Sequence, residues 1–257
     1  MTTIAVTGSA GGMGRAIRSR LEADGSTVLG VDLADAEVTA DLRTAEGRRS
    51  LADQVADRCD GVLDGLVVAA GVQAADASTI LSVNYFGAVA TLTALRPLLE
   101  RAHDAAVVAV ASNTTTTHPG YPAEIAEQCL AGDEPGALAA IGDDALGAYP
   151  VSKLALSRWV RRHAPSPEWI GAGIRLNAIA PGFIETPMTE GIWEVVESIG
   201  DVYPIPVRRP GRPEEIAELC AFLLGPAAGF ICGSIVTIDG GTEAALRPDD
   251  WPRPYDS

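Results

Sequence analysis

Residues 4–14, IAVTGSAGGMG, decide the fold. They begin with a short apolar run of β-type residues and pass through four glycines. They lead into residues 14–23, where Ile17 and Leu21 lie four apart on one helical face. A strand, a glycine loop and a helix in this order predict the first unit of an α/β sheet.

The glycine positions indicate what the loop binds. Gly8 suits a tight turn, Gly12 lets the backbone approach a pyrophosphate, and Gly14 lets the helix pack closely on the strand. The first amides of the helix then face the phosphates, where the helix dipole favours negative charge. We expect a dinucleotide-binding loop that also brings Ser9 and Met13 to the cofactor. A purely structural glycine turn is the alternative.

Apolar runs and helical patterns alternate along the rest of the chain. The runs are apolar throughout rather than alternating with polar residues, which is typical of parallel strands covered on both faces. The sequence therefore predicts one α/β domain spanning residues 1–257, with a Rossmann-type, doubly wound parallel sheet and helices on both faces. The predicted strands are residues 26–33, 66–70, 105–111, 174–179 and 235–238, and the predicted helices are residues 82–100, 151–164 and 213–224.

Two connections depart from this alternation. Only eight residues separate Asp32 from Asp41, too few for a crossover helix with its loops, so we expect a loop there. Residues 119–147 contain no obvious strand and carry Gly, Pro and acidic residues around helical pieces at 124–130 and 135–141. We expect this insert to form a helical flap over one end of the sheet.

Asp32 ends the second predicted strand, eighteen residues past Gly14. A carboxylate at this point accepts hydrogen bonds from both adenine-ribose hydroxyls and repels a 2′-phosphate. No Lys or Arg follows it until Arg43, so we expect NAD rather than NADP as the cofactor. Leu33, Asp41 and Leu42 are expected near the adenosine half. A carboxylate that only caps a turn is the alternative for Asp32.

Tyr149 and Lys153 lie four residues apart and so share one helical face. We expect the helix to start here, with Pro150 at its first position. A free phenol has a pKa near 10, and a neighbouring ammonium stabilises the phenolate and lowers that pKa. The pair therefore suits proton transfer at an alcohol or carbonyl. Taken alone, the spacing is more typical of a solvated helix face, but here it follows the strands of a nucleotide-binding pattern, the last of them at 105–111.

As an ordered set, these motifs resemble the short-chain dehydrogenase/reductase family over essentially the whole chain. The resemblance implies that Tyr149 is the general acid/base and that Lys153 lowers its pKa while holding the nicotinamide ribose. It also implies that Ser112 bonds the reacting oxygen and that Asn84 holds a water in a proton relay. The residues that carry the resemblance are Thr7, Gly8, Gly12, Gly14, Asp32, Ala69-Ala70-Gly71, Asn84, Ser112, Tyr149, Lys153, Asn177, Pro181-Gly182 and Asp239-Gly240-Gly241.

Three details refine this assignment. Ser112 directly follows a strand and is preferred among several hydroxyls, with Thr114 as the fallback. Gly71, Ile184 and Thr186 are expected to border the cofactor, as the resemblance implies. The family's Asn-Asn-Ala-Gly is here residues 68–71, VAAG, so the side-chain bonds of those asparagines are missing from the local sheet support.

Within the family, the chain is similar to the bacterial 3α-hydroxysteroid dehydrogenase/carbonyl reductase subgroup. The likeness lies in residues 31–42, 82–88 and 239–248, and in the long insert. That insert separates Ser112 from Tyr149 by 149 − 112 = 37 positions. We expect it to block the four-helix contact that many members use and to leave a homodimer through another face, with a tetramer as the alternative.

The leading function is reversible hydride transfer between a secondary alcohol or ketone and NAD. A 3α-hydroxysteroid or similar carbonyl compound is the first substrate class, and an aryl alcohol of the coniferyl type is the second. A 3-oxoacyl-carrier-protein reductase is a third interpretation, and a non-catalytic nucleotide-sensing module is a fourth. The residues expected to line the substrate pocket, unless they only pack the insert and lid, are Pro119, Tyr121, Met188, Ile192 and Trp193.

The composition excludes several other classes. The 257 residues carry 34 acidic and 19 basic side chains, a formal charge of −15, which disfavours binding to nucleic acid or to anionic membranes. Four scattered cysteines and three scattered histidines show no metal-ligand spacing, so no metal is expected. The chain shows neither a signal-peptide pattern nor an unbroken apolar run long enough to span a bilayer, so we expect a cytoplasmic protein.

Overall fold

The computed structural model describes residues 2–73, 75–120 and 122–250. Its centre is a seven-stranded sheet in the order β3-β2-β1-β4-β5-β6-β7, in which every pairing is parallel. This doubly wound order confirms the predicted fold class. The strands are β1 (Thr3–Thr7), β2 (Thr27–Asp32), β3 (Val38–Thr39), β4 (Gly65–Val68), β5 (Ala105–Val110), β6 (Ile174–Pro181) and β7 (Ile235–Ile238).

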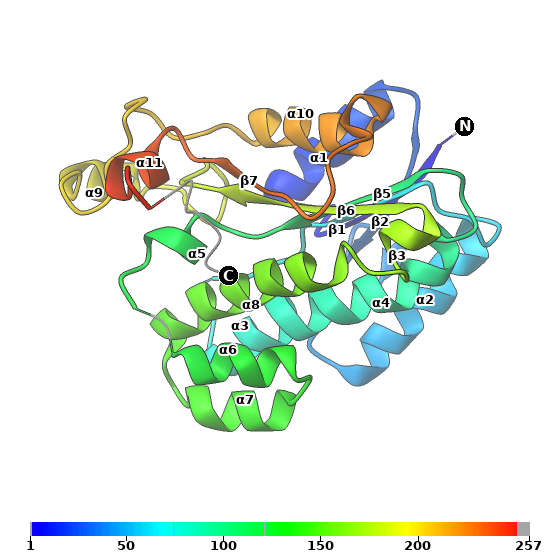
Figure 1. The fold of residues 1–257 in the computed structure, drawn as a ribbon, viewed down its shortest axis with the longest axis horizontal. Coiled ribbons are helices and arrows are strands. Elements are labelled where there is room, and N and C mark those ends of the chain that lie inside the picture. The colour runs from blue at the N-terminus through cyan, green and yellow to red at the C-terminus, as the bar shows by residue number, and fades with distance from the viewer. Residues whose placement is uncertain (1, 74, 121, 251–257) are drawn as a thin grey trace.

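Helices cover the two faces of the sheet unequally (Figure 1). One face carries α1 (Gly12–Ala23) and α10 (Pro213–Leu224), and the other carries α2 (Ala45–Arg58), α4 (Ala88–Leu99) and α8 (Ala145–His163). Each face encloses its own cluster of buried apolar side chains. The central strands β4, β5 and β6 are buried along their whole length, which explains why their sequences do not alternate.

The predicted helix at 82–100 belongs to a longer run over Ala77–Leu99. It consists of α3 (Ala77–Leu81), a π-helical turn η1 (Ser82–Gly87) and α4. By length and composition alone this run could cross a membrane, but 61% of its apolar window is buried inside the protein. Its apolar character is accounted for by the core beneath the sheet.

The insert contains α6 (Ala123–Leu130) and α7 (Glu134–Ile141), so both predicted helical pieces are present, and α5 (Thr114–Thr117) lies just before it. They do not form a flap over the end of the sheet. Instead, α6 packs on α8, and α7 contacts α3 and α8, as an additional layer outside the helices of that face (Figure 1). The buried side chains Ile125, Cys129 and Ile141 draw them there.

Two local predictions meet different outcomes. The short connection between β2 and β3 contains no helix, as expected from its length. The helix start near Tyr149 is wrong, because α8 begins at Ala145 and the side chain of Asp144 accepts a hydrogen bond from the amide of Gly147. Pro150 therefore lies inside the helix rather than at its first position. A capping aspartate sets the boundary before the proline is reached.

The remaining short elements lie near the carboxyl ends of the strands or at chain turns. The segment between β6 and α10, residues 182–212, contains α9 (Trp193–Ser198), and we call it the β6–α10 segment. The other elements are η2 (Ile170–Ala172), η3 (Pro226–Ala228) and α11 (Thr242–Leu246).

Candidate active site

The predicted site residues follow the carboxyl ends of β1, β2, β4, β5 and β6. Because all these strands are parallel, their carboxyl ends meet along one edge of the sheet. In doubly wound sheets this edge is where ligands bind, at the point where the strand order reverses. That point is here between β1 and β4, which both border the glycine loop.

The glycine loop has the geometry that its sequence predicts. Gly8 has φ +70° and lies so close to β4 that an added Cβ would be 2.9 Å from the Cα of Ala70. Gly12 has φ +48°, and its added Cβ would be 3.8 Å from the side chain of Thr186. At Gly14 an added Cβ would be only 2.0 Å from the carbonyl oxygen of Gly8. The third glycine thus lets α1 pack directly on the loop.

The start of α1 fits an anionic group. Gly11 is its N-cap residue and makes no side-chain cap bond, and no heavy atom lies within 4 Å of an added Cβ there. The first helix amides therefore lack a side-chain acceptor within the described chain, and such amides suit a pyrophosphate. Ser9 is buried with its hydroxyl against Gly30 of β2, so its backbone is the part that can contact a cofactor.

Asp32 lies directly beside this loop. Its Oδ2 accepts a hydrogen bond from the amide of Ala10 at 3.0 Å, and its Oδ1 accepts one from the amide of Leu33 at 2.7 Å. The carboxylate is only partly buried. Its remaining acceptor positions can bind ribose hydroxyls, because a carboxylate offers about four lone-pair sites. This placement supports the expectation for Asp32.

The other adenosine-side residues differ in exposure. Leu33 is exposed, whereas Leu42 is buried against Gly87, the last residue of η1. Asp41 binds the guanidinium of Arg43, with 2.7 Å between Oδ2 and the nearest nitrogen, and this bond is the main cause that lowers its pKa. The first basic residue after Asp32 is thus already paired with a carboxylate.

Tyr149, Ser112 and Lys153 come together where β5 meets α8. Ser112 is buried, and its side chain acts to lower the pKa of the Tyr149 phenol, which favours Ser112 over Thr114 as the site hydroxyl. The amine of Lys153 lies 5.9 Å from the centroid of the Tyr149 ring and donates to the carbonyl oxygen of Val110 at 2.9 Å. A hydroxyl, a phenol and an amine therefore surround one point at the sheet edge.

The pKa values correct one expectation. Burial raises the pKa of Tyr149, and the bond with Ser112 offsets only part of that rise. Burial also lowers the pKa of Lys153 to about 8. The expected lowering of the Tyr149 pKa by Lys153 is therefore absent from this structure, because the amine is directed to Val110 and desolvation dominates both groups.

Asn84 and Gly71 lie beside the lysine. An added Cβ on Gly71 would be 3.3 Å from Oδ1 of Asn84 and 3.4 Å from the amine of Lys153. The side chain of Asn84 makes three hydrogen bonds: Oδ1 accepts from the amide of Val72, and Nδ2 donates to the Val72 carbonyl and to the Ser152 hydroxyl. The side-chain donors of Asn84 are thus committed to neighbouring residues, and its backbone lies in the π-helical turn η1.

The β6–α10 segment brings further predicted residues to this edge. Thr186 faces Gly12, and Ile184 is buried and forms a β-bridge with Gly211. Met188 and Ile192 are exposed, and Pro119 is exposed as well. Tyr121 lies outside the described residues. Trp193 lines a cavity of about 380 Å³ together with Val196, Glu197, Gly200, Tyr203, Pro204, Ile205, Pro206 and Arg208.

Two functional neighbours were missed by sequence reasoning. Asn113, next to Ser112, donates a hydrogen bond to the phenol oxygen of Tyr203 at 2.9 Å and another to Asp239 at 3.2 Å. The sequence signals were weak, because Asn113 lies in a run of polar residues and Tyr203 belongs to no motif. Only Asp239 was recognised, as part of an Asp-Gly-Gly motif.

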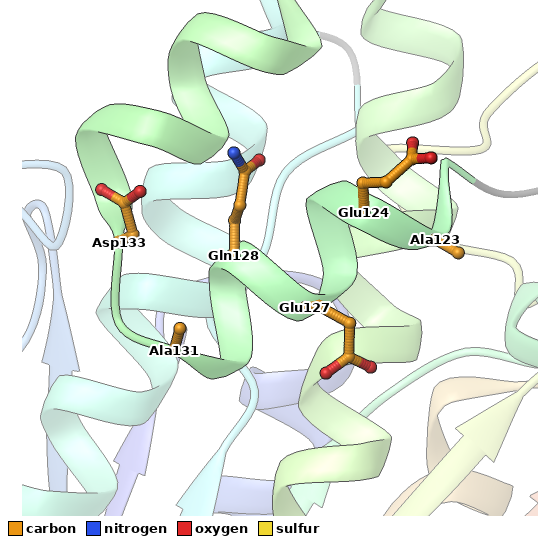
Figure 2. Close-up of a pocket in the computed structure, with 6 residues that line it drawn as sticks. All are labelled: Ala123, Glu124, Glu127, Gln128, Ala131 and Asp133. Atoms are coloured by element: carbon orange, nitrogen blue, oxygen red, sulfur yellow. The ribbon is translucent and has the colours of Figure 1, made fainter.

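A second hollow, of about 500 Å³, lies on the insert and carries none of the predicted chemistry. Its lining comes from α6 and the following turn (Figure 2). Glu127 is engaged by Arg158 and Arg162, and Asp133 caps α7 by accepting from the amide of Gly136. Among the residues that the structure describes, no three metal-ligating side chains cluster.

Comparison with known proteins gives consistent matches over nearly the whole chain. Residues 2–123 match the family model described as short chain dehydrogenase, and residues 136–243 match one described as enoyl-(acyl carrier protein) reductase. The chain is 40% identical to the 3-alpha-hydroxysteroid dehydrogenase/carbonyl reductase of Comamonas testosteroni, over 98% of this chain and 100% of that protein.

Two more relatives define the range of similarity. The crystal structure of the 3-alpha-hydroxysteroid dehydrogenase from Pseudomonas sp. B-0831, complexed with NADH, is 42% identical, with a TM-score of 0.88 over 96% of this chain and 99% of that one. A 3-oxoacyl-[acyl-carrier-protein] reductase of Thermotoga maritima is 26% identical over 92% of this chain and 95% of that protein. The steroid dehydrogenases are therefore much more similar to this chain than that carrier-protein reductase.

Proposed function

The chain belongs to the short-chain dehydrogenase/reductase family, and from this premise we propose that it is an NAD-dependent oxidoreductase that interconverts secondary alcohols and ketones. One observation carries the proposal. The Tyr149 phenol, whose pKa is influenced by Ser112 and whose ring lies 5.9 Å from the Lys153 amine, is at the same sheet edge as the glycine loop. An acid/base group thus lies at the sheet edge where the nicotinamide end of a bound dinucleotide is expected.

The side chains divide the proton chemistry between them. In alcohol oxidation, Tyr149 accepts the hydroxyl proton while Ser112 donates a hydrogen bond to the reacting oxygen. In ketone reduction, the same phenol returns a proton to that oxygen. When bound, NAD supplies the hydride acceptor for the carbinol carbon, and NADH supplies the donor in reverse. Lys153, with a pKa of about 8, is mainly protonated at neutral pH, and we expect its ammonium group to hold the nicotinamide ribose when the cofactor is bound.

Because burial raises the pKa of Tyr149, the phenol is protonated near neutral pH. It is then ready to act as an acid in ketone reduction. Alcohol oxidation needs the deprotonated form, so its rate should rise as the pH increases above neutral.

NAD fits the cofactor side better than NADP. Gly12 and the first amides of α1 would hold the pyrophosphate, Asp32 the adenine ribose, and Lys153 the nicotinamide ribose. Arg43 is paired with Asp41, and Arg18 is paired with Glu22 and Glu37, so neither is a free partner for a 2′-phosphate. The 42% identical dehydrogenase was crystallised with NADH.

A 3α-hydroxysteroid or a similar carbonyl compound is the proposed substrate. The two relatives at 40% and 42% identity both carry 3α-hydroxysteroid dehydrogenase in their names. The β6–α10 segment presents exposed apolar side chains, as a lid for an apolar molecule needs. These side chains are Met188, Ile192, Val195, Ile199, Val202 and Val207.

The test is an absorbance assay for NADH formation with 3α-hydroxysteroid, aryl and aliphatic alcohols, and with NADP in parallel. We expect the steroid with NAD to be turned over fastest, and oxidation to be faster at pH 9 than at pH 7. If only aryl alcohols were turned over, the steroid assignment would be wrong and the aryl alcohol would be the substrate class. No turnover of any alcohol or ketone with either cofactor would overturn the enzymatic proposal.

We also propose a cytoplasmic homodimer. Three of the four free cysteines are buried and none forms a disulfide, which suits a reducing compartment. The insert covers the outer side of α8, the sheet edge at β7 stays half-exposed, and Phe222 and Phe230 are exposed. Light scattering should give the mass of two subunits, and a mass of four would refute the dimer.

A further inference from the structure

Tyr203 makes a side-chain link between the β6–α10 segment and the catalytic edge of the sheet. Its phenol oxygen accepts a hydrogen bond from Nδ2 of Asn113 at 2.9 Å and donates one to Oδ1 of the same amide at 3.0 Å. Both polar atoms of the Asn113 side chain thus bind one phenol.

Asn113 is itself held rigidly. It is 2% exposed and directly follows Ser112, and its backbone amide donates to the carbonyl oxygen of Pro181 at 2.9 Å. Its side chain also donates to Asp239, which accepts from the amides of Gly241 at 3.0 Å and Glu243 at 2.7 Å. The ends of β5, β6 and β7 therefore meet at this one residue.

The backbone next to Tyr203 packs on the same corner. The amide of Val207 donates to the carbonyl of Gly240 at 3.2 Å, and an added Cβ on Gly240 would be 2.5 Å from the Val207 side chain. An added Cβ on Gly241 would be 3.2 Å from Pro206. The hydrogen bond of Tyr203 is thus one link within a close contact between the β6–α10 segment and residues 239–241. Tyr203 also lines the cavity that Trp193 lines.

We propose that Tyr203 is a positioning residue for substrate binding, which holds the β6–α10 segment against Asn113 so that its apolar side chains enclose the alcohol next to Ser112. This inference rests on the proposed oxidoreductase function. It adds a determinant of substrate affinity that lies outside the proton-transfer residues.

The chemistry of Tyr203 separates it from Tyr149. Its hydroxyl already donates to Asn113 and accepts from it, so it is committed to the link rather than to a substrate. Burial raises its pKa to about 12 against the opposing effect of the Asn113 bond, which keeps it neutral over the working pH range. It positions the segment without exchanging protons.

The test compares Tyr203→Phe with wild type in the steroid oxidation assay. Phe keeps the ring and removes only the hydroxyl, so KM for the alcohol should rise about threefold to tenfold, the effect of one lost hydrogen bond. We expect kcat, the shape of the pH profile and the Kd for NAD to stay unchanged. The matched control is Ser50→Ala, which removes a hydroxyl bond to the Gly47 carbonyl inside α2, away from the segment, and should leave KM unchanged.

A second variant keeps the proposal falsifiable if the first is poorly folded. Asn113→Ala should raise KM at least as much, and the double variant should be no worse than Asn113→Ala, because both changes break the same link. An unchanged KM in Tyr203→Phe overturns the proposal. Equal losses in kcat, NAD affinity and thermal stability also overturn it, since they indicate a merely structural role. Absence of wild-type turnover instead refutes the proposed function itself.

Discussion

Gly14→Ala tests the glycine loop at its tightest contact. The new Cβ would lie 2.0 Å from the carbonyl oxygen of Gly8 and 2.6 Å from its carbonyl carbon. These are backbone atoms that cannot rotate away, so we take the upper end of overpacking costs, about 3 kcal/mol. The higher helix propensity of alanine offsets about 1 kcal/mol of this cost. The net loss of about 2 kcal/mol corresponds to a fall in Tm of roughly 4–8 °C for a chain of this size.

The matched control lies three residues earlier. Gly11 has φ −143°, which alanine adopts without strain, and an added Cβ there meets no heavy atom within 4 Å. Thermal unfolding of the cofactor-free variants, followed by circular dichroism, should place Gly11→Ala within about 2 °C of wild type. A Gly14→Ala variant that melts like wild type would show that the loop does not pack on α1 as described.

Two further predictions concern single ionisable groups. Asp32→Ala should weaken NAD binding roughly tenfold to hundredfold, the worth of hydrogen bonds to a charged group, and weaken NADP less. Calorimetric titration with NAD measures this affinity, and the control is Asp53→Ala, which removes the same charge from an exposed position on α2. Equal NAD affinity in wild type, Asp32→Ala and Asp53→Ala would contradict the ribose assignment. Burial lowers the pKa of Lys153 to about 8, so the amine binds a proton more tightly in the unfolded chain than in the folded one. The buried charge therefore destabilises the folded protein at low pH, and this destabilisation fades as the pH rises. Relative to Lys153→Met in urea unfolding, wild type should gain about 1 kcal/mol between pH 8 and pH 9, and a constant difference would contradict the buried amine.

The parts of the fold that depend on short-range patterns were predictable. The apolar runs that became β4, β5 and β6 are buried on both faces, and the spacing between Asp32 and Asp41 excluded a helix. The position of the insert was not predictable in this way. Which surface α6 and α7 cover depends on buried side chains such as Cys129 and on the partners that α8 offers.

The site shows the same division between spacing and environment. Glycine roles and the grouping of Tyr149 with Lys153 and Ser112 followed from spacing and from the family resemblance. The direction of the Tyr149 pKa did not, because desolvation depends on how much protein surrounds the phenol. Tyr203 was missed because the bond to Asn113 joins positions 90 residues apart, and no local pattern marks either of them.

Turnover by Tyr149→Phe tests the central claim most directly. The variant keeps the ring and removes the phenolic oxygen that exchanges the proton, so NADH formation from a 3α-hydroxysteroid should fall by at least about 100-fold. The Kd for NAD, measured on the same preparation, should stay within about a factor of two of wild type, since the glycine loop and Asp32 are untouched. Near-normal turnover with intact NAD binding would contradict the assignment of Tyr149 as the acid/base.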